Sequence, residues 1–215
     1  SVFNTLYFMV TIIDYGSGNI QAISTIYRNL NIEHQVVNKA QDISIDTSRI
    51  ILPGVGSFDQ TMLSLNNSGF RSKLEKLVIS DTVPILGICV GMQILAKTSE
   101  EGKLFGLGWI DGNVKKFQFV EKSVLRVPHL GWNTIEMKKK SSIFNGFDNQ
   151  RGFYFIHSFY FECDNEVDIL CETNYGTNFT SGVQKFNIYG TQFHPEKSHI
   201  NGVNLLKNFA QNVEI

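Results

Sequence analysis

Short runs of β-branched and apolar residues alternate with segments of helical periodicity over the first half of the chain. The runs at 10–14, 33–37, 49–54 and 84–88 predict strands. Between the first two, apolar residues of segment 20–30 fall on one helical face. Strands that alternate with crossover helices pair in parallel. The sequence therefore predicts an α/β fold, with the wholly apolar run at 84–88 as a central strand of a mostly parallel sheet.

The second half has a different texture. Aromatic runs bounded by glycine and turn residues, at 152–161 and 167–175, predict further strands joined by turns, and 202–211 predicts a last helix. No internal repeat or linker separates the halves, so we expect one domain from Met9 to residue 215. Residues 1–8 are interpreted as an extension upstream of a natural start at Met9.

Composition narrows the class of protein. The 215 residues are 42% hydrophobic with a formal net charge of −1, so the chain lacks the basic excess of a nucleic-acid binder. No apolar run approaches the roughly 20 residues of a spanning helix, and no membrane association is expected. Cys89, Cys163 and Cys171 match neither a disulfide framework nor a metal site, which favours a reducing compartment, the cytoplasm.

A cysteine stands between two glycines where the central strand meets a helical pattern. Gly87-Ile-Cys89-Val-Gly91 has the arrangement of a nucleophile elbow, in which a sharp turn lifts one side chain above the sheet. The adjoining helix N-terminus favours a thiolate, and the Val90 backbone N–H is directed at a developing oxyanion. Since a lone cysteine is more often a core residue, the motif alone leaves a catalytic and a structural interpretation evenly matched.

A thiolate nucleophile needs an acid and base, and one of the five histidines has a carboxylate beside it. In "QFHPEKS", Glu196 follows His194 by two residues, and alternate residues of an extended stretch share a face. Glu196 is therefore expected to orient the His194 imidazole. His34 and His199 are expected at the surface, and His129 and His157 have no acidic neighbour in sequence. An isolated His-Pro-Glu would more often be structural.

The two motifs together resemble the class I glutamine amidotransferases. Further segments are similar to the glutaminase subunits of imidazole glycerol phosphate synthase, over nearly the whole chain from Met9. They are "IIDYGSGN", "ILPGVGSF", "GICVGMQIL", "VPHLGWN", "FYFIHSF", "VQKFNIYGTQFHPEKS" and "LLKNF". The resemblance implies a three-layer fold with a central, mostly parallel sheet, flanking helices and an additional β-rich part in the second half.

The resemblance also implies roles for individual residues. Cys89 would be the nucleophile, His194 the acid and base, and Glu196 the orienting carboxylate. The oxyanion would be held by Val90 and by a donor from Gly54 and Val55, in a loop that switches between a hidden and a presented N–H. The substrate-binding positions implied are Gly54, Gln93, Tyr154, His157 and Ser158. No cofactor and no metal are expected.

A partner is implied as well. The family passes ammonia to a cyclase with a (β/α)8 barrel fold, as a heterodimer in histidine biosynthesis, and Trp132 and Asn19 would lie on the docking face. One alternative is a paralogous glutaminase that supplies ammonia to a sugar amidotransferase for surface polysaccharide. Another is a catalytically silent scaffold, which the presence of Cys89, His194 and Glu196 argues against.

Overall fold

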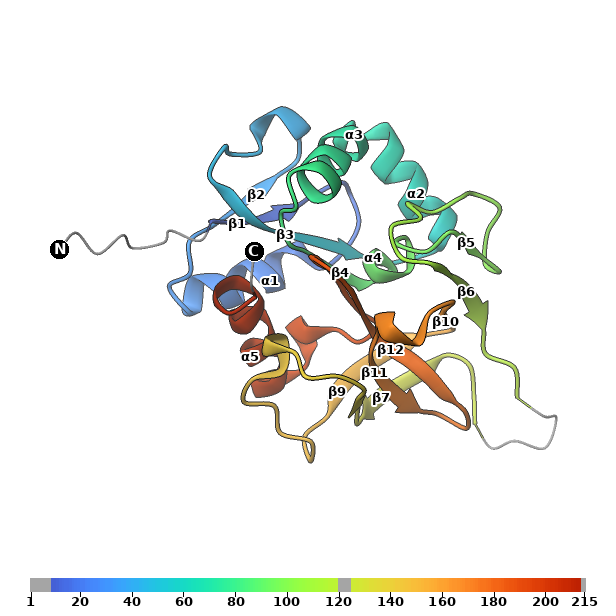
Figure 1. The fold of residues 1–215 in the computed structure, drawn as a ribbon. Helices are drawn as coiled ribbons and strands as arrows, with labels where there is room; N and C mark the ends of the chain where they lie inside the picture. The colour runs from blue at the N-terminus through green and yellow to red at the C-terminus, as the bar shows by residue number, and fades with distance from the viewer. Residues whose placement is uncertain (1–8, 120–124, 214–215) are drawn as a thin grey trace.

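A computed structural model describes residues 9–119 and 125–213; the extension proposed for residues 1–8 lies outside them. Within these residues a mixed sheet of 11 strands has the order β2-β1-β3-β4-β13-β12-β10-β6-β5, with β11 paired to β12 and β8 to β11 (Figure 1). The strands of this sheet are β1 (Met9–Ile13), β2 (His34–Val37), β3 (Thr47–Gly54), β4 (Ile85–Cys89), β5 (Thr98–Ser99), β6 (Gly112–Lys116), β8 (Glu136–Met137), β10 (Phe159–Cys163), β11 (Ile169–Asn174), β12 (Asn178–Lys185) and β13 (Ile188–Thr191). The strands β7 (His129–Asn133) and β9 (Phe153–His157) form a separate antiparallel pair.

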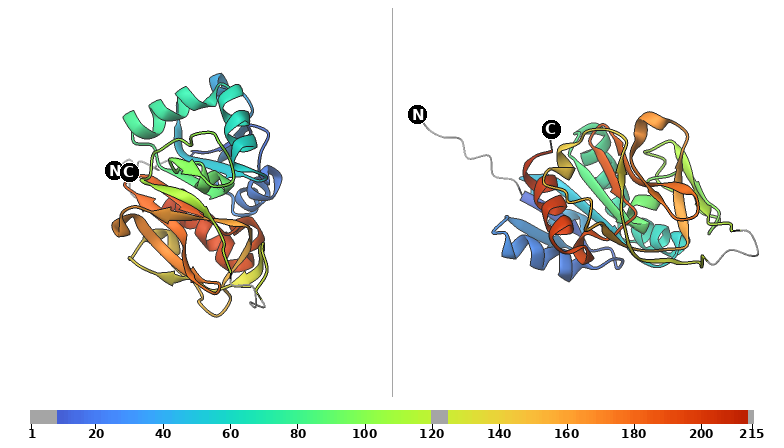
Figure 2. Two further views of the ribbon diagram at one scale, coloured as in Figure 1. Left: turned by 90° about the vertical axis from the view of Figure 1, so that its right-hand side faces the viewer. Right: turned by 90° about the horizontal axis from the view of Figure 1, so that it is seen from below.

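Helices cover the parallel part of the sheet on both faces. The α-helices are α1 (Ile20–Asn29), α2 (Phe58–Asn67), α3 (Phe70–Glu75), α4 (Val90–Gln93) and α5 (His199–Gln211). Short 3₁₀ turns occupy Ala40–Asp42, Ser142–Phe144, Glu166–Asp168 and Pro195–Lys197, and a π-helical turn, Lys76–Ser80, continues α3. Figures 1 and 2 show α1 and α5 on one side of these strands and α2 and α3 on the other. The result is a three-layer arrangement.

The parallel strands follow from their sequences. All five residues of β4 are buried, because strands β3 and β13 flank it in parallel and helices lie over both faces. Burying a single Leu or Ile side chain in such a position contributes about 1.5–3 kcal/mol. On α1, Ile20, Ile23 and Tyr27 are the apolar face that packs inward. The four strands predicted for the first half are therefore present, within one or two residues at their ends.

The antiparallel half begins where β12 pairs with β13. Strands β12, β10 and β6 continue the sheet, and aromatic side chains of this half, including Phe155, Phe179 and Phe193, are completely or almost completely buried in the core. The last helix starts at His199 rather than at Gly202, because the 3₁₀ turn before it already directs the chain into the helix. Among the described residues no helix combines the length and apolar character that crossing a membrane requires.

Three neighbouring strands end at the same edge of the sheet. The register of β3 on β4 pairs Gly54 with Cys89, and that of β13 on β4 pairs Thr191 with Ile88. The segment after β13 therefore runs past Cys89, and the loop after β1 lies beside the end of β3. Ligands of open parallel sheets bind at this carboxyl edge.

Candidate active site

Cys89 lies at a strained turn between β4 and α4. Its backbone has φ 56° and ψ −113°, a combination that non-glycine residues rarely adopt. The flanking glycines are required by close approach rather than by their own dihedrals. A Cβ on Gly91 would overlap the carbonyl oxygen of Leu52, and a Cβ on Gly87 would lie 2.5 Å from the Gly91 oxygen. The turn thus fits tightly against β3 and presents Cys89 at the sheet edge.

The Val90 backbone N–H also belongs to this turn. Val90 is the first residue of α4, so its N–H has no acceptor within the helix. The residue lines the same pocket as Cys89. An N–H in this position is available to an oxygen that approaches the sulfur.

Segment 53–56, the last two residues of β3 and the two that follow, is held by loop 14–19 after β1. The Val55 N–H donates to Ser17 Oγ at 2.9 Å, and the Ser17 hydroxyl donates to the Val55 oxygen at 3.0 Å. The Tyr15 hydroxyl donates to the Pro53 oxygen at 2.5 Å, and Gly18 has no space for a Cβ against the Pro53 ring. The Val55 N–H predicted to face an oxyanion is therefore bound by the neighbouring loop.

His194 and Glu196 form a buried pair. Nδ1 of His194 lies 2.8 Å from Oε1 of Glu196, and the two side chains are only 3% and 1% exposed. The predicted contact is present, but its backbone differs from the extended stretch expected. Residues Pro195–Lys197 form a 3₁₀ turn, and the Ser198 hydroxyl donates to the His194 oxygen at 2.6 Å to close it.

The other imidazole nitrogen is turned toward Cys89. Nε2 of His194 is buried without a hydrogen-bond partner among the described residues. Burial alone would lower the pKa of His194, but the Cys89 sulfur and the Glu196 carboxylate together outweigh it and raise the pKa to about 10. The site therefore favours a protonated imidazole between a sulfur and a carboxylate.

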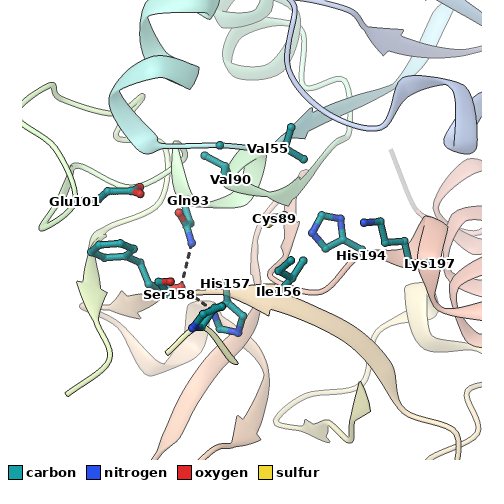
Figure 3. A pocket seen from close by; sticks show the side chains of 13 residues that line it. Val55, Cys89, Val90, Gln93, Glu101, Ile156, His157, Ser158, His194 and Lys197 are labelled. Atoms are coloured by element: carbon teal, nitrogen blue, oxygen red, sulfur yellow. Dashed lines mark hydrogen bonds between the residues drawn. The ribbon is translucent and has the colours of Figure 1, made fainter. Parts of the chain in front are cut away.

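A pocket of about 350 Å³ opens above these residues. Figure 3 shows Glu101 and Gln93 on one side, His194 and Lys197 on the other, and Cys89 between them. The complete lining is Val55, Gly56, Cys89, Val90, Gln93, Glu101, Pro128, Ile156, His157, Ser158, Phe159, His194 and Lys197. The volume suits a small polar molecule of amino-acid size.

The sequence-predicted substrate positions are only partly brought together here. Gln93, His157 and Ser158 line the pocket, but Gly54 and Tyr154 do not. Gly54 packs against the backbone of the elbow, where a Cβ would lie 2.5 Å from the Gly91 nitrogen. The Tyr154 ring faces Lys197, whose Nζ lies 5.7 Å from the ring centroid.

His157 lines the pocket with both ring nitrogens already engaged. Nδ1 lies 2.7 Å from the Phe159 oxygen, and Nε2 lies 2.9 Å from Nδ1 of the buried His129. Burial lowers the pKa of His157 to about 3 and that of His129 to about 4. Both imidazoles are therefore neutral at physiological pH, and His157 shapes the pocket rather than offering it a free donor.

The two predicted interface residues lie outside the pocket. Trp132 is 48% exposed on β7, and its ring stacks on His199 with centroids 5.1 Å apart. Asn19 is partly buried, directly before α1 in the loop that holds Val55. His199, expected at the surface, is exposed there and has a positive φ of 47°.

Three residues of the site were not identified from sequence. Glu101 and Lys197 are charged residues at the pocket. Gln192 is completely buried, and its Nε2 lies 3.8 Å from the Cys89 sulfur. The spacing from Gln192 to His194 is the alternation that places two side chains on one face, so the motif contained a signal for Gln192. Among the described residues no group of three or more His, Cys, Asp or Glu side chains could hold a metal ion.

Comparisons with known proteins show the family and the fold of the chain. The family model for "Glutamine amidotransferase class-I" matches residues 11–213. Solved structures show the same fold: a crystal structure of a glutamine amidotransferase is 19% identical with a TM-score of 0.69 and covers 93% of this chain and 96% of its own. The structure of PurLQS from Thermotoga maritima is 18% identical with a TM-score of 0.69, covering 94% and 96%. The predicted fold class is confirmed.

Relatives with a higher sequence identity define the family more closely. The imidazole glycerol phosphate synthase subunit HisH of Leptospira borgpetersenii is 49% identical over 94% of this chain and 99% of its own length. The subunit HisH of Bdellovibrio bacteriovorus is 48% identical over 94% and 100%. The chain therefore belongs to the class I glutamine amidotransferases and, within them, to the family of imidazole glycerol phosphate synthase subunits HisH. The predicted family and enzyme class are confirmed.

Proposed function

We propose that this chain hydrolyses glutamine to glutamate and ammonia, with Cys89 as nucleophile, His194 as acid and base, and Glu196 as the orienting carboxylate. The observation that supports this most directly is the buried His194–Glu196 pair at 2.8 Å, whose unpartnered Nε2 is turned toward a cysteine on a strained turn. If the histidine–glutamate pair were purely structural, we would expect the second imidazole nitrogen to be hydrogen-bonded rather than left unsatisfied beside a thiol.

In the first half of the reaction, the Cys89 thiolate attacks the side-chain carbonyl carbon of glutamine. The protonated Nε2 of His194 gives its proton to the leaving nitrogen as the carbon–nitrogen bond breaks. Ammonia leaves and a glutamyl thioester remains on the sulfur. The buried Glu196 carboxylate stabilises the imidazolium while it carries the proton.

In the second half, water replaces ammonia. The neutral His194 takes a proton from water, whose oxygen attacks the thioester carbon. The carbon–sulfur bond breaks, glutamate is released, and the thiolate and the imidazolium are restored. Nδ1 of His194 is bound to the Glu196 carboxylate, so Nε2 is the nitrogen that gives the proton in the first half-reaction and takes it in the second.

The oxyanion of both half-reactions needs two donors. The Val90 N–H is one, since it begins α4 next to the sulfur. The second is the Val55 N–H, after the peptide between Gly54 and Val55 turns away from Ser17. Because Ser17 holds this N–H in the structure, we propose that the isolated chain rests in a form of low activity.

Substrate recognition is assigned to the opposite side of the pocket. Glu101 is exposed there, with Oε2 accepting from the Phe58 N–H at 2.8 Å, while Oε1 accepts no hydrogen bond from the residues that the structure describes. A carboxylate at this place suits the α-ammonium of glutamine. Gln93 and Ser158 complete the contacts with the amino-acid end.

The product ammonia is proposed to pass to a second subunit. The relatives are named as subunits of imidazole glycerol phosphate synthase, which supports a cyclase partner in histidine biosynthesis. We propose that this partner has a (β/α)8 barrel fold and that Trp132 and Asn19 contact it. An exposed tryptophan is a common interface anchor.

The test is glutamate release from glutamine by the purified chain, alone and with the same organism's cyclase and its phosphoribulosyl ligand. Partner and ligand should raise the rate strongly, and Cys89→Ala should remove it while Cys163→Ala, at a half-buried cysteine outside the site, should not. Turnover by the Cys89→Ala complex would refute the assignment. Labelling of Cys89 by a glutamine-derived alkylating analogue without stimulation would point to a different ammonia acceptor.

A further inference from the structure

Gln192 is a completely buried carboxamide between the elbow and the segment that carries His194. It follows β13, and its backbone N–H donates to the Ser181 oxygen of β12 at 2.9 Å, which holds this residue beside the sheet before the chain bends toward His194. Its Nε2 donates to the Cys89 sulfur at 3.8 Å. Its Oε1 accepts from Nε2 of Gln93 at 3.0 Å. Both ends of one amide are thus engaged with residues of the site.

These contacts fix the orientation of the Gln93 amide. Its Nε2 carries two hydrogens, and both are used, one by Gln192 Oε1 and one by the Phe159 oxygen at 3.1 Å. Figure 3 shows the nitrogen end of Gln93 turned toward the backbone near Ser158. The oxygen end accepts no hydrogen bond from the described residues, and Gln93 lines the pocket. Gln93 therefore offers its pocket an acceptor and no donor.

The reverse orientation of the amides is disfavoured. Turning Gln192 over would place its nitrogen against the nitrogen of Gln93, two donors facing each other, and would leave its oxygen against the Cys89 sulfur. Burying an amide without hydrogen-bond partners costs free energy, and an apolar side chain of similar size does not carry this cost. The buried amide is thus held in one orientation by its partners.

We propose that Gln192 is a positioning residue of this active site. It holds Gln93 with its oxygen toward the substrate, so that Gln93 and Glu101 form a pair of acceptors for the α-ammonium of an amino acid, and it places an N–H on the Cys89 sulfur that favours the thiolate. The inference rests on the proposed function for the identity of the substrate. The contacts of Gln192 themselves are independent of it.

The first test measures glutamine affinity without turnover. Isothermal titration calorimetry is performed with the full chain carrying Cys89→Ala, with and without Gln192→Met. Methionine has a similar volume but cannot bind the Gln93 amide, so glutamine should bind at least about tenfold more weakly. Thr191→Val is the matched control, because Thr191 is equally buried at the adjacent position and its hydroxyl donates to the Phe193 oxygen rather than to Gln93 or Cys89. It should leave the affinity unchanged.

The second test examines the contact between Gln192 and the Cys89 sulfur. The rate of alkylation by iodoacetamide is followed against pH in chains that retain Cys89. Gln192→Met should move the profile to higher pH, because the thiolate loses a hydrogen-bond donor. Burial raises the pKa of both Cys163 and Cys171 to about 12, so these cysteines stay silent below pH 9. Thr191→Val should again match the parent chain.

Gln192→Asn provides a second variant if methionine prevents folding. Asparagine keeps the amide but is one methylene shorter, so it cannot reach both Gln93 and Cys89. Gln192→Asn should therefore show weaker glutamine binding and an alkylation profile at higher pH. Wild-type affinity and a wild-type alkylation profile in either folded variant would overturn the positioning role. Failure of the parent Cys89→Ala chain to bind glutamine would count against the proposed function instead, and the alkylation profile would then decide the role of Gln192 alone.

Discussion

The Ser17 hydroxyl bridges the two polar atoms of the Val55 backbone, accepting from its N–H at 2.9 Å and donating to its oxygen at 3.0 Å. One side chain from the loop after β1 therefore fixes the direction of the peptide that the proposed mechanism needs to turn. Loop 14–19 also contains Asn19, the proposed partner contact. A partner that moves this loop would release the Val55 N–H.

Removing the hydroxyl should raise the activity of the chain without its partner. In Ser17→Ala the resting peptide loses about 0.5–1.5 kcal/mol of hydrogen bonding, so basal glutamate release is expected to rise by about two- to tenfold. The stimulated rate should change less, because the loop is already displaced there. Ser48→Ala, at the opposite end of β3, is the control. An unchanged basal rate in Ser17→Ala would show that Ser17 does not limit the turn.

The Glu196 carboxylate should act on rate rather than on affinity. Glu196→Gln removes the charge that helps raise the pKa of His194 to about 10, so less imidazolium forms in the variant. Stimulated kcat is expected to fall at least about 100-fold with little change in glutamine affinity. Steady-state kinetics of the complex measures both quantities. A loss expressed mainly in KM would contradict an orienting role.

The same pair links stability to pH. A histidine with a raised pKa stabilises the folded state fully below its unfolded pKa, near 6.5, and this contribution is lost as the pH rises through about 10. Urea unfolding at pH 6 and pH 10.5 should therefore show a larger loss of stability for the parent chain than for Glu196→Gln. Equal losses would indicate that the carboxylate does not hold the proton.

The His129–His157 pair should make the fold sensitive to acid. Their lowered pKa values, about 4 and about 3, mean that the unfolded chain binds protons more readily than the folded chain below pH 6.5. The contribution of this pair to stability should be fully present above pH 6.5 and be lost progressively as the pH drops toward 4. His129→Gln should reduce this loss between pH 7.5 and 5, measured by urea unfolding. His34→Gln, at a partly exposed histidine outside this pair, should retain it.

The elbow should tolerate no side chain at Gly91. A Cβ there would overlap the Leu52 carbonyl oxygen; Leu52 belongs to β3 and Gly91 to α4, so the contact is between the backbones of two packed elements. Gly91→Ala is expected to lower the free energy of unfolding by about 3 kcal/mol or more, or to prevent folding. At Gly16 a Cβ meets nothing within 4 Å, although φ is 87°. Gly16→Ala should therefore cost only about 1–2 kcal/mol. Comparable losses at both positions would contradict the steric argument.

The sequence by itself determined the local features of this protein. Strand 84–88 could be predicted because its residues are apolar throughout, and the turn at Cys89 because glycine spacing is a local property of the chain. The proximity of Glu196 to His194 was also accessible, since two residues separate them, although the backbone between them is a 3₁₀ turn.

Only the tertiary structure decided which distant groups meet. Gln192 and Gln93 are 99 positions apart, and Ser17 and Val55 are 38 apart. Their contacts depend on the order and register of β1, β3, β4 and β13, which bring four chain segments to one edge of the sheet. Hydrogen bonds of this kind act over about 3 Å and have no periodic signature in the sequence. For this reason the direction of the Val55 N–H and the orientation of the Gln93 amide follow from the folded structure alone.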